Sequence, residues 1–179
     1  MNMLIRRLNV GSIFANMNYF ELFGLPVSLH PDRSLIAKKY FELQKQYHPD
    51  FYTNADEEEQ REVLEISSMI NKGLKVLQQP QETIKYVLHL KGLLEEEEKY
   101  QLPPDFLMEM MELNEKLHET DRADFKTEVN ELEDALYNEV KDIIEIYDDS
   151  SITTEDLLKV KEYYFKKKYL HRILDRLDD

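Results

Sequence analysis

Cysteine and tryptophan are absent from this chain of 179 residues, and glycine occurs only 4 times. The lack of cysteine excludes disulfides, thiolate metal ligands and cysteine nucleophiles, and it fits a reducing compartment. With 4 glycines and 6 prolines the chain has little turn chemistry for a sheet, whereas 42% hydrophobic and 34% charged residues suit helices. We therefore predict an all-α fold of two small helical domains.

Long apolar runs and an excess of positive charge are also missing. No apolar segment approaches the roughly 20 residues that span a bilayer, so no membrane-spanning helix is expected. The net charge of −14 repels phosphate backbones and anionic lipids, so we expect neither nucleic acid nor a membrane as a partner. The sequence thus indicates a soluble protein, and a monomer is the default expectation.

The first 16 residues stand apart from the patterned sequence that follows. They contain Arg6 and Arg7 among apolar residues and no acidic residue, which a weak organelle presequence would also show. Because Met17 directly precedes the first patterned segment, we instead expect residues 1–16 to be a disordered extension or the product of a mis-assigned start.

Hydrophobic periodicity divides the remainder into three parts. The expected domain ranges are 17–91, a polar linker over 92–103, and a three-helix bundle over 104–179. In the first part we predict a brief helix over 18–23, a helix from Asp32 to before Pro49, a helix over 55–79 and a short one over 83–91. The second and third should form an antiparallel hairpin. Their predicted inward residues are Leu35, Ile36, Tyr40, Leu43 and Tyr47, then Val63, Ile66, Ile70, Leu74 and Leu77.

In the last part we predict helices over 104–119, 122–147 and 154–177. The two halves differ in charge, since residues 18–91 contain 9 basic and 11 acidic residues while residues 104–179 contain 11 and 22. The first half nevertheless has a basic helix face formed by Lys38, Lys39 and Lys45. A solvated helix face would explain such lysines equally well.

Two His-Pro-Asp tripeptides occur, and only their context separates them. In His30-Pro31-Asp32 the aspartate has an ordinary helix-capping position. His48-Pro49-Asp50 instead follows the basic helix, at the predicted tip of the hairpin. Proline there fixes one backbone torsion and holds a polar and a charged side chain at an exposed loop, which another protein can recognise.

The order of these features resembles the J-domain family. It is carried by Tyr19-Phe20, Leu22, Gly24-Leu25, the basic helix, His48-Pro49-Asp50, Ile70-Asn71, Leu77 and Pro80. The resemblance implies that the His48-Pro49-Asp50 loop, with Lys38, Lys39 and Lys45, docks on a DnaK/HscA-type chaperone and stimulates its ATPase. Asp50 would compete for an arginine of the chaperone, so the mechanism would be binding rather than catalysis.

Beyond the J domain, the sequence resembles the HscB family of iron-sulfur cluster assembly co-chaperones. Some eukaryotic relatives have an additional cysteine-rich N-terminal metal module, and because this sequence lacks one, the resemblance implies a bacterial-type, cytoplasmic protein. The matching segments run from Met17 to Pro26, Leu43 to Tyr47, Tyr86 to Gly92 and Phe106 to Glu109. Phe106, Met110, Leu113 and Leu117 already supply one core stripe for the helix over 104–119, which leaves further apolar and acidic residues for another face. The resemblance implies that this face binds an IscU-type scaffold through Leu107, Met108, Met111, Glu112, Glu115, Glu119 and an aromatic, best matched by Tyr164 and next by Phe165.

Several positions depart from the usual J-domain pattern. They are Phe51, Gly73, Leu74, Thr83 and Ile84. Glycine inside a helix costs roughly 1 kcal/mol relative to alanine, so Gly73 predicts a weaker helix.

Rival interpretations can be separated by the same residues. A generic J-domain adaptor would serve a different client with its acidic bundle. An enzyme would use His48 with Asp50 for acid–base chemistry, but the sequence shows no nucleophile elbow or phosphate loop, and we expect no catalytic residue. The 5 histidines lack paired ligand spacing, so no metal or other cofactor is expected.

Overall fold

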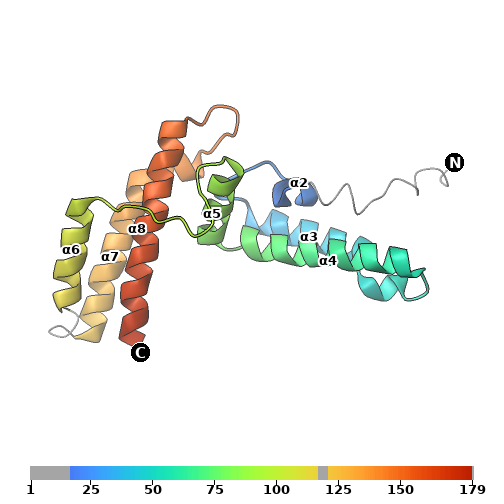
Figure 1. Cartoon of the computed structure of the whole chain (residues 1–179), viewed down its shortest axis with the longest axis horizontal. Helices are drawn as coiled ribbons and strands as arrows, with labels where there is room; N and C mark the ends of the chain where they lie inside the picture. The colour runs from blue at the N-terminus through green and yellow to red at the C-terminus, as the bar shows by residue number, and fades with distance from the viewer. Residues whose placement is uncertain (1–16, 117–120, 179) are drawn as a thin grey trace. The chain divides into compact units, whose positions relative to one another are not determined.

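The computed structural model describes residues 17–116 and 121–178, and the regular secondary structure within them is helical (Figure 1). This confirms the all-α prediction. The chain forms two compact units. Unit 1 consists of the residues up to Val27 and Pro31–Thr83, and unit 2 consists of Ser28–His30 and the residues from Ile84 onward. The division falls inside the range predicted for the first domain, and the domain ranges stay a prediction.

Helix α2 (Tyr19–Phe23) opens unit 1 and is capped at both ends. The Asn18 side chain accepts a hydrogen bond from the Glu21 N–H at 3.0 Å, and the Glu21 carboxylate accepts one from the Asn18 N–H at 2.8 Å. This capping box satisfies backbone donors that a helix leaves unpaired. Gly24 ends the helix with a φ of 61°, a left-handed conformation that glycine adopts at little cost. The brief helix predicted here is confirmed.

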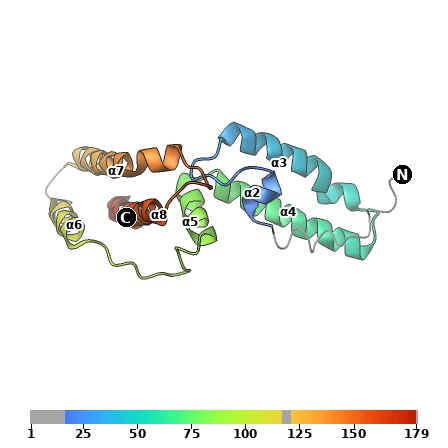
Figure 2. The same cartoon turned by 90° about the horizontal axis from the view of Figure 1, so that it is seen from above.

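Helices α3 (Arg33–Tyr47) and α4 (Glu57–Leu77) form the antiparallel hairpin, joined at its tip by the 3-10 helix η1 (Pro49–Tyr52) (Figures 1 and 2). Leu35 was predicted to face inward but is 39% exposed. It lies about 100° around the helix from Ile36, and the latter is the one that turns into the core. Among the described residues of unit 1, the buried apolar side chains are Phe20, Leu22, Phe23, Ile36, Val63, Ile66, Ile70 and Leu77.

A polar contact ties the middle of the hairpin together. The Asn71 Oδ1 atom on α4 accepts hydrogen bonds from the Tyr40 hydroxyl at 3.1 Å and from the Gln44 Nε2 at 3.2 Å. Both donors lie on α3, one turn apart. The contact therefore fixes the register of the two helices that carry the tip.

Gly73 lies where α2 packs against α4, and its lack of a side chain allows that packing. A Cβ atom built there would be 2.8 Å from Cε2 of Phe23 and 3.1 Å from Cδ1 of Tyr19. These are closer than ordinary van der Waals contacts, and Phe23 is only 2% exposed. The residue that predicted a weaker helix therefore has a packing function.

The junction after α4 differs from the predicted helices over 55–79 and 83–91. α4 ends at Leu77, and Pro80 begins helix α5 (Pro80–Leu90), a position where the missing N–H of proline costs nothing. The fully buried Thr83 hydroxyl donates to the carbonyl oxygens of Val76 at 2.9 Å and Gln79 at 3.1 Å. Thr83 thus ties the end of α4 to the start of α5.

Unit 2 is built around helix α8 (Thr154–Asp178), which packs against both α6 (Pro104–Lys116) and α7 (Arg122–Glu145) (Figure 2). Residues 117–120, at the end of the helix predicted over 104–119, lie outside the described residues, and so does the predicted core residue Leu117. Within the described ranges no helix is both long and apolar enough to cross a membrane. The bundle core includes Phe106, Met110, Leu113, Phe125, Val129, Leu136, Val140, Ile144, Leu157, Val160, Tyr163, Tyr164, Leu170 and Ile173.

The segment over 92–103, predicted to be a polar linker, is anchored to the rest of unit 2. Leu94 is 5% exposed, and the Glu98 carboxylate lies 2.6 Å from the Lys161 ammonium. The Tyr100 ring stacks on Phe165 of α8, with ring centroids 4.5 Å apart and planes within 3°. Apolar and ionic contacts therefore hold this polar segment against α8.

Candidate partner-binding sites

The tripeptide His48-Pro49-Asp50 lies where α3 ends and η1 begins. The His48 Nδ1 accepts a hydrogen bond from the Asp50 N–H at 3.3 Å, which requires a neutral ring protonated on Nε2. Nδ1 also lies 3.6 Å from Asp50 Oδ2, which is beyond hydrogen-bonding distance. The Asp50 side chain is 82% exposed and therefore accessible to a partner.

Two side chains that the sequence did not single out hold this tip in place. The Tyr52 hydroxyl donates to the Gln46 carbonyl oxygen at 2.9 Å, joining η1 to the last turn of α3. The Gln60 Nε2 donates to the carbonyl oxygens of Thr53 at 3.2 Å and Ala55 at 2.9 Å, joining the loop to α4. Because the acceptors are backbone groups, no pairing pattern in the sequence reveals these contacts.

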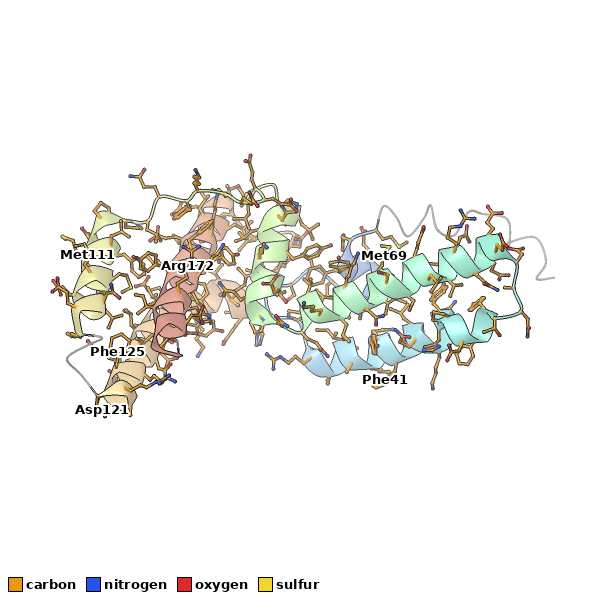
Figure 3. The ribbon with its side chains drawn as sticks, turned by 60° about the horizontal axis from the view of Figure 1, so that its bottom comes forward. Phe41, Met69, Met111, Asp121, Phe125 and Arg172 are labelled. Carbon is orange, nitrogen blue, oxygen red and sulfur yellow. The ribbon has the colours of Figure 1, made fainter. Side chains whose placement is uncertain are left out.

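The lysines predicted to bind the chaperone differ in their surroundings. Lys38 and Lys45 are exposed and have no carboxylate partner among the described residues. Lys39 instead lies 3.1 Å from the Glu42 carboxylate, whose negative charge offsets the positive charge of the lysine. Phe41 lies on the same face as Lys38 and Lys45 by helical spacing and is 64% exposed, on the side of α3 turned away from α4 (Figure 3). Sequence reasoning did not single it out.

The other tripeptide, His30-Pro31-Asp32, has the structural position expected of it. The Asp32 carboxylate accepts hydrogen bonds from the Ser34 hydroxyl at 2.7 Å, the Ser34 N–H at 2.7 Å and the Leu35 N–H at 3.2 Å. These bonds, the one from the Ser34 hydroxyl above all, hold the pKa of Asp32 below its usual range. Asp32 is therefore the N-cap of α3, and its carboxylate is engaged in the chain's own backbone.

Helix α6 separates its apolar residues into a buried stripe and an exposed patch. Leu107, Met108 and Met111, which we call the α6 patch, are 36%, 59% and 65% exposed. Met111 lies on the side of α6 turned away from α8 (Figure 3). Glu112 and Glu115 continue this exposed surface, whereas Glu119 lies outside the described residues. The placement is the one predicted, and the binding role of the patch stays a prediction.

The aromatic predicted beside this patch needs correction. Tyr164 is only 5% exposed, because its ring turns into the bundle core. Its neighbour Phe165 is half-buried and, together with Leu107, lines an open groove. Phe165 and Tyr169 are thus the aromatic residues of α8 that line this groove, and Tyr164 supports Phe165 by an edge contact with ring centroids 5.2 Å apart.

Metal ligands were not expected from the sequence. In the part of the chain that the structure describes, no three His, Asp or Glu side chains converge on one point. That the protein needs no metal or other cofactor stays a prediction.

Comparison with known sequences reveals similarity over most of the chain. Residues 102–178 match the family model described as the HSCB C-terminal oligomerisation domain. A co-chaperone protein HscB homolog of Shewanella woodyi is 31% identical over 170 residues, which cover 91% of this chain and 98% of that protein. A homolog from Vibrio cholerae is 39% identical over 102 residues, 56% of this chain and 60% of the relative, so that match spans less than two thirds of the relative's length.

Solved structures show the same similarity in three dimensions. The crystal structure of human co-chaperone protein HscB superimposes with a TM-score of 0.76 at 26% identity, covering 91% of this chain and 81% of the human one. Chaperone HscB from Vibrio cholerae gives a TM-score of 0.69 at 26% identity, covering 90% and 96%. The similarity therefore extends over both units.

Proposed function

This chain belongs to the HscB family of co-chaperones, and we propose that it stimulates the ATPase of a DnaK/HscA-type chaperone and delivers an IscU-type iron-sulfur scaffold to it. The observation that carries the first part is the exposed Asp50 carboxylate at a tip fixed on both sides by hydrogen bonds. The exposed Lys38 and Lys45 lie on the helix that leads into that tip.

The proposed action of unit 1 is a shift of the chaperone's conformational equilibrium. A partner that binds the hydrolysis-competent state more tightly raises its population by that difference in affinity, with no chemistry of its own. Asp50 would compete for an arginine that otherwise restrains the chaperone. The Tyr52 and Gln60 contacts support this role because a fixed loop loses little conformational entropy on docking.

Unit 2 supplies the proposed scaffold-binding surface. The α6 patch exposes three apolar side chains that the bundle core does not need, and Glu112 and Glu115 border them. An apolar centre with a charged rim is the usual composition of a protein interface. We assign Phe165 rather than Tyr164 as the aromatic residue of this surface, because Phe165 is accessible beside Leu107.

The first experiment measures steady-state ATPase activity of the chaperone with this protein and with its Asp50→Asn variant. We expect the variant to lose most of the stimulation, at least about tenfold, because a carboxylate–arginine contact is replaced by a neutral one. Asp32→Asn is the matched control: it makes the same chemical change in the other tripeptide, where asparagine caps a helix equally well. Equal stimulation by wild type and Asp50→Asn would refute this part.

The second experiment adds the IscU-type scaffold. Changing Leu107, Met108 and Met111 together to alanine should weaken scaffold binding at least about tenfold and remove the scaffold's synergy, while basal stimulation persists. Leu158→Ala, at an exposed leucine of α8, is the control. Wild-type stimulation with no scaffold effect would retain the J-domain role but assign unit 2 to another client, as in a generic adaptor.

The rival enzymatic function finds no support at the tip. Acid–base catalysis normally takes place in a pocket that excludes water, whereas the His48 and Asp50 side chains are 45% and 82% exposed. A cytoplasmic location and a monomeric state stay predictions, the second of which sedimentation velocity can check.

A further inference from the structure

A groove of 460 Å³ lies on unit 2, at one edge of the α6 patch. Residues 98–102 form one wall, α8 forms the other, and Leu107 belongs to both the groove and the patch. The α8 wall consists of Phe165, Lys168, Tyr169 and Arg172, whose spacing places them on one face of the helix (Figure 3 marks Arg172).

Aromatic rings give the groove a rigid apolar surface. Tyr100 and Phe165 stack face to face with centroids 4.5 Å apart. Tyr169 meets the buried Phe106 edge to face at 6.1 Å, which ties that part of the wall to the core of the bundle. Because these rings are already ordered, binding would cost conformational entropy only in the side chain that binds and not in the rings.

The groove is also cationic, although residues 104–179 contain twice as many acidic as basic residues. Lys99, Lys168 and Arg172 have no carboxylate partner among the residues that the structure describes, and the one acid of the lining, Glu98, is paired with Lys161 at 2.6 Å. Elsewhere on α8 the lysines do have acidic partners. They are Lys159, Lys161, Lys166 and Lys167.

We infer that this groove binds an extended acidic segment of a partner protein. An apolar or aromatic side chain of that segment would lie against the Tyr100–Phe165 stack, and its carboxylates would meet Lys99, Lys168 and Arg172. Three unpaired cations beside an aromatic surface are complementary to a peptide of this composition.

The inference rests on the proposed function, because Leu107 joins the groove to the α6 patch and one scaffold can cover both. Such a partner must carry charges of both signs. Basic residues would face Glu112 and Glu115, and an acidic segment would face the groove. This arrangement gives binding one orientation, since a reversed partner would bring like charges together.

The first arm of the test uses a probe that does not depend on the scaffold. Binding of a fluorescein-labelled peptide Asp-Glu-Phe-Glu-Asp to the full chain is followed by anisotropy, with Lys-Lys-Phe-Lys-Lys as the comparison peptide. Lys168→Gln/Arg172→Gln should weaken binding of the acidic peptide about tenfold. Lys85→Gln/Lys141→Gln removes two exposed lysines of unit 2 outside the groove and should leave the affinity for the acidic peptide within about twofold.

The second arm measures scaffold affinity for the same variants and for Leu107→Ala/Met108→Ala/Met111→Ala. A loss of about tenfold with Lys168→Gln/Arg172→Gln, and a shallower salt dependence, would support the inference. If only the α6 patch variant loses affinity, the proposed function stands and the inference is overturned. Failure of the acidic peptide to bind, equal binding of the basic peptide, or self-association of the chain through the groove would each overturn it as well.

Discussion

Replacing Gly73 with alanine should destabilise this protein, although the same change stabilises most helices. Gly73 lies in the interior of α4, where alanine would gain about 1 kcal/mol of helix propensity. The new methyl group, however, would be 2.8 Å from the Phe23 ring and 3.1 Å from the Tyr19 ring. The sign of the effect depends on whether those rings can move away.

The structure indicates that they cannot move freely. Phe23 is 2% exposed, so its ring has other core atoms behind it. Its helix is pinned by the capping box at Asn18 and by the left-handed Gly24, which limits a rigid shift of α2. Forcing an extra carbon into a packed core costs roughly 1–3 kcal/mol, so after the propensity gain we expect a net loss of about 1 kcal/mol.

Urea unfolding of the full chain measures the change in the free energy of unfolding. Hydrogen exchange of the α2 and α4 amides then tests whether the loss of protection lies at this contact. A loss of 1 kcal/mol lowers the melting temperature of a chain of this size by about 2–4 °C. Ser68→Ala, at an exposed position of the same helix, should be neutral or slightly stabilising. A Gly73→Ala protein as stable as Ser68→Ala, or more stable, would refute the packing argument.

Three further predictions concern other contacts. Thr83→Val keeps the shape of the side chain but removes the one hydroxyl proton that Val76 and Gln79 share as carbonyl acceptors, so the free energy of unfolding should fall by about 1 kcal/mol in urea titrations. Burial tends to raise the pKa of Glu133, but Lys167 at 2.6 Å outweighs it, and the pKa is lowered. Glu133→Gln should therefore cost about 1 kcal/mol at neutral pH, and the difference from wild type should shrink only as pH falls below 4.5, the ordinary pKa of glutamate, and through the lowered pKa of Glu133. Glu112→Gln/Glu115→Gln should slow scaffold association and flatten its salt dependence in stopped-flow measurements, with little change in dissociation.

The helices were predictable because local signals and periodicity agree along most of the chain. Asp32 and Gly24 mark helix ends where the sequence predicts them, and α7 and α8 both begin at the predicted residues. The exposure of the α6 patch was also predictable, since the core stripe of that helix was already complete without it. These features depend on neighbours close in sequence, for which spacing is sufficient information.

The errors arise where contacts join distant segments. Leu35 fits the apolar stripe of α3 but lies at its margin. It is exposed because the surface that α3 buries is too narrow to include it. Gly73 looked like a weakness because its partners Phe23 and Tyr19 lie some 50 residues earlier. Residues 92–103 looked like a linker because their composition is polar. In each case the sequence shows the residue but not the partner that gives it a role.

The aromatic run on α8 shows why the site itself needed the structure. Tyr163, Tyr164 and Phe165 are consecutive, so successive rings point about 100° apart and only one can face the groove. Periodicity cannot choose among them, because α8 packs on both α6 and α7 and its buried face is correspondingly wide. The stacking of Tyr100 on Phe165 makes the choice, since it covers one side of that ring and leaves it beside Leu107. The same contact brings Lys99 toward the face of Lys168 and Arg172, so the segment that looked like a linker creates the groove.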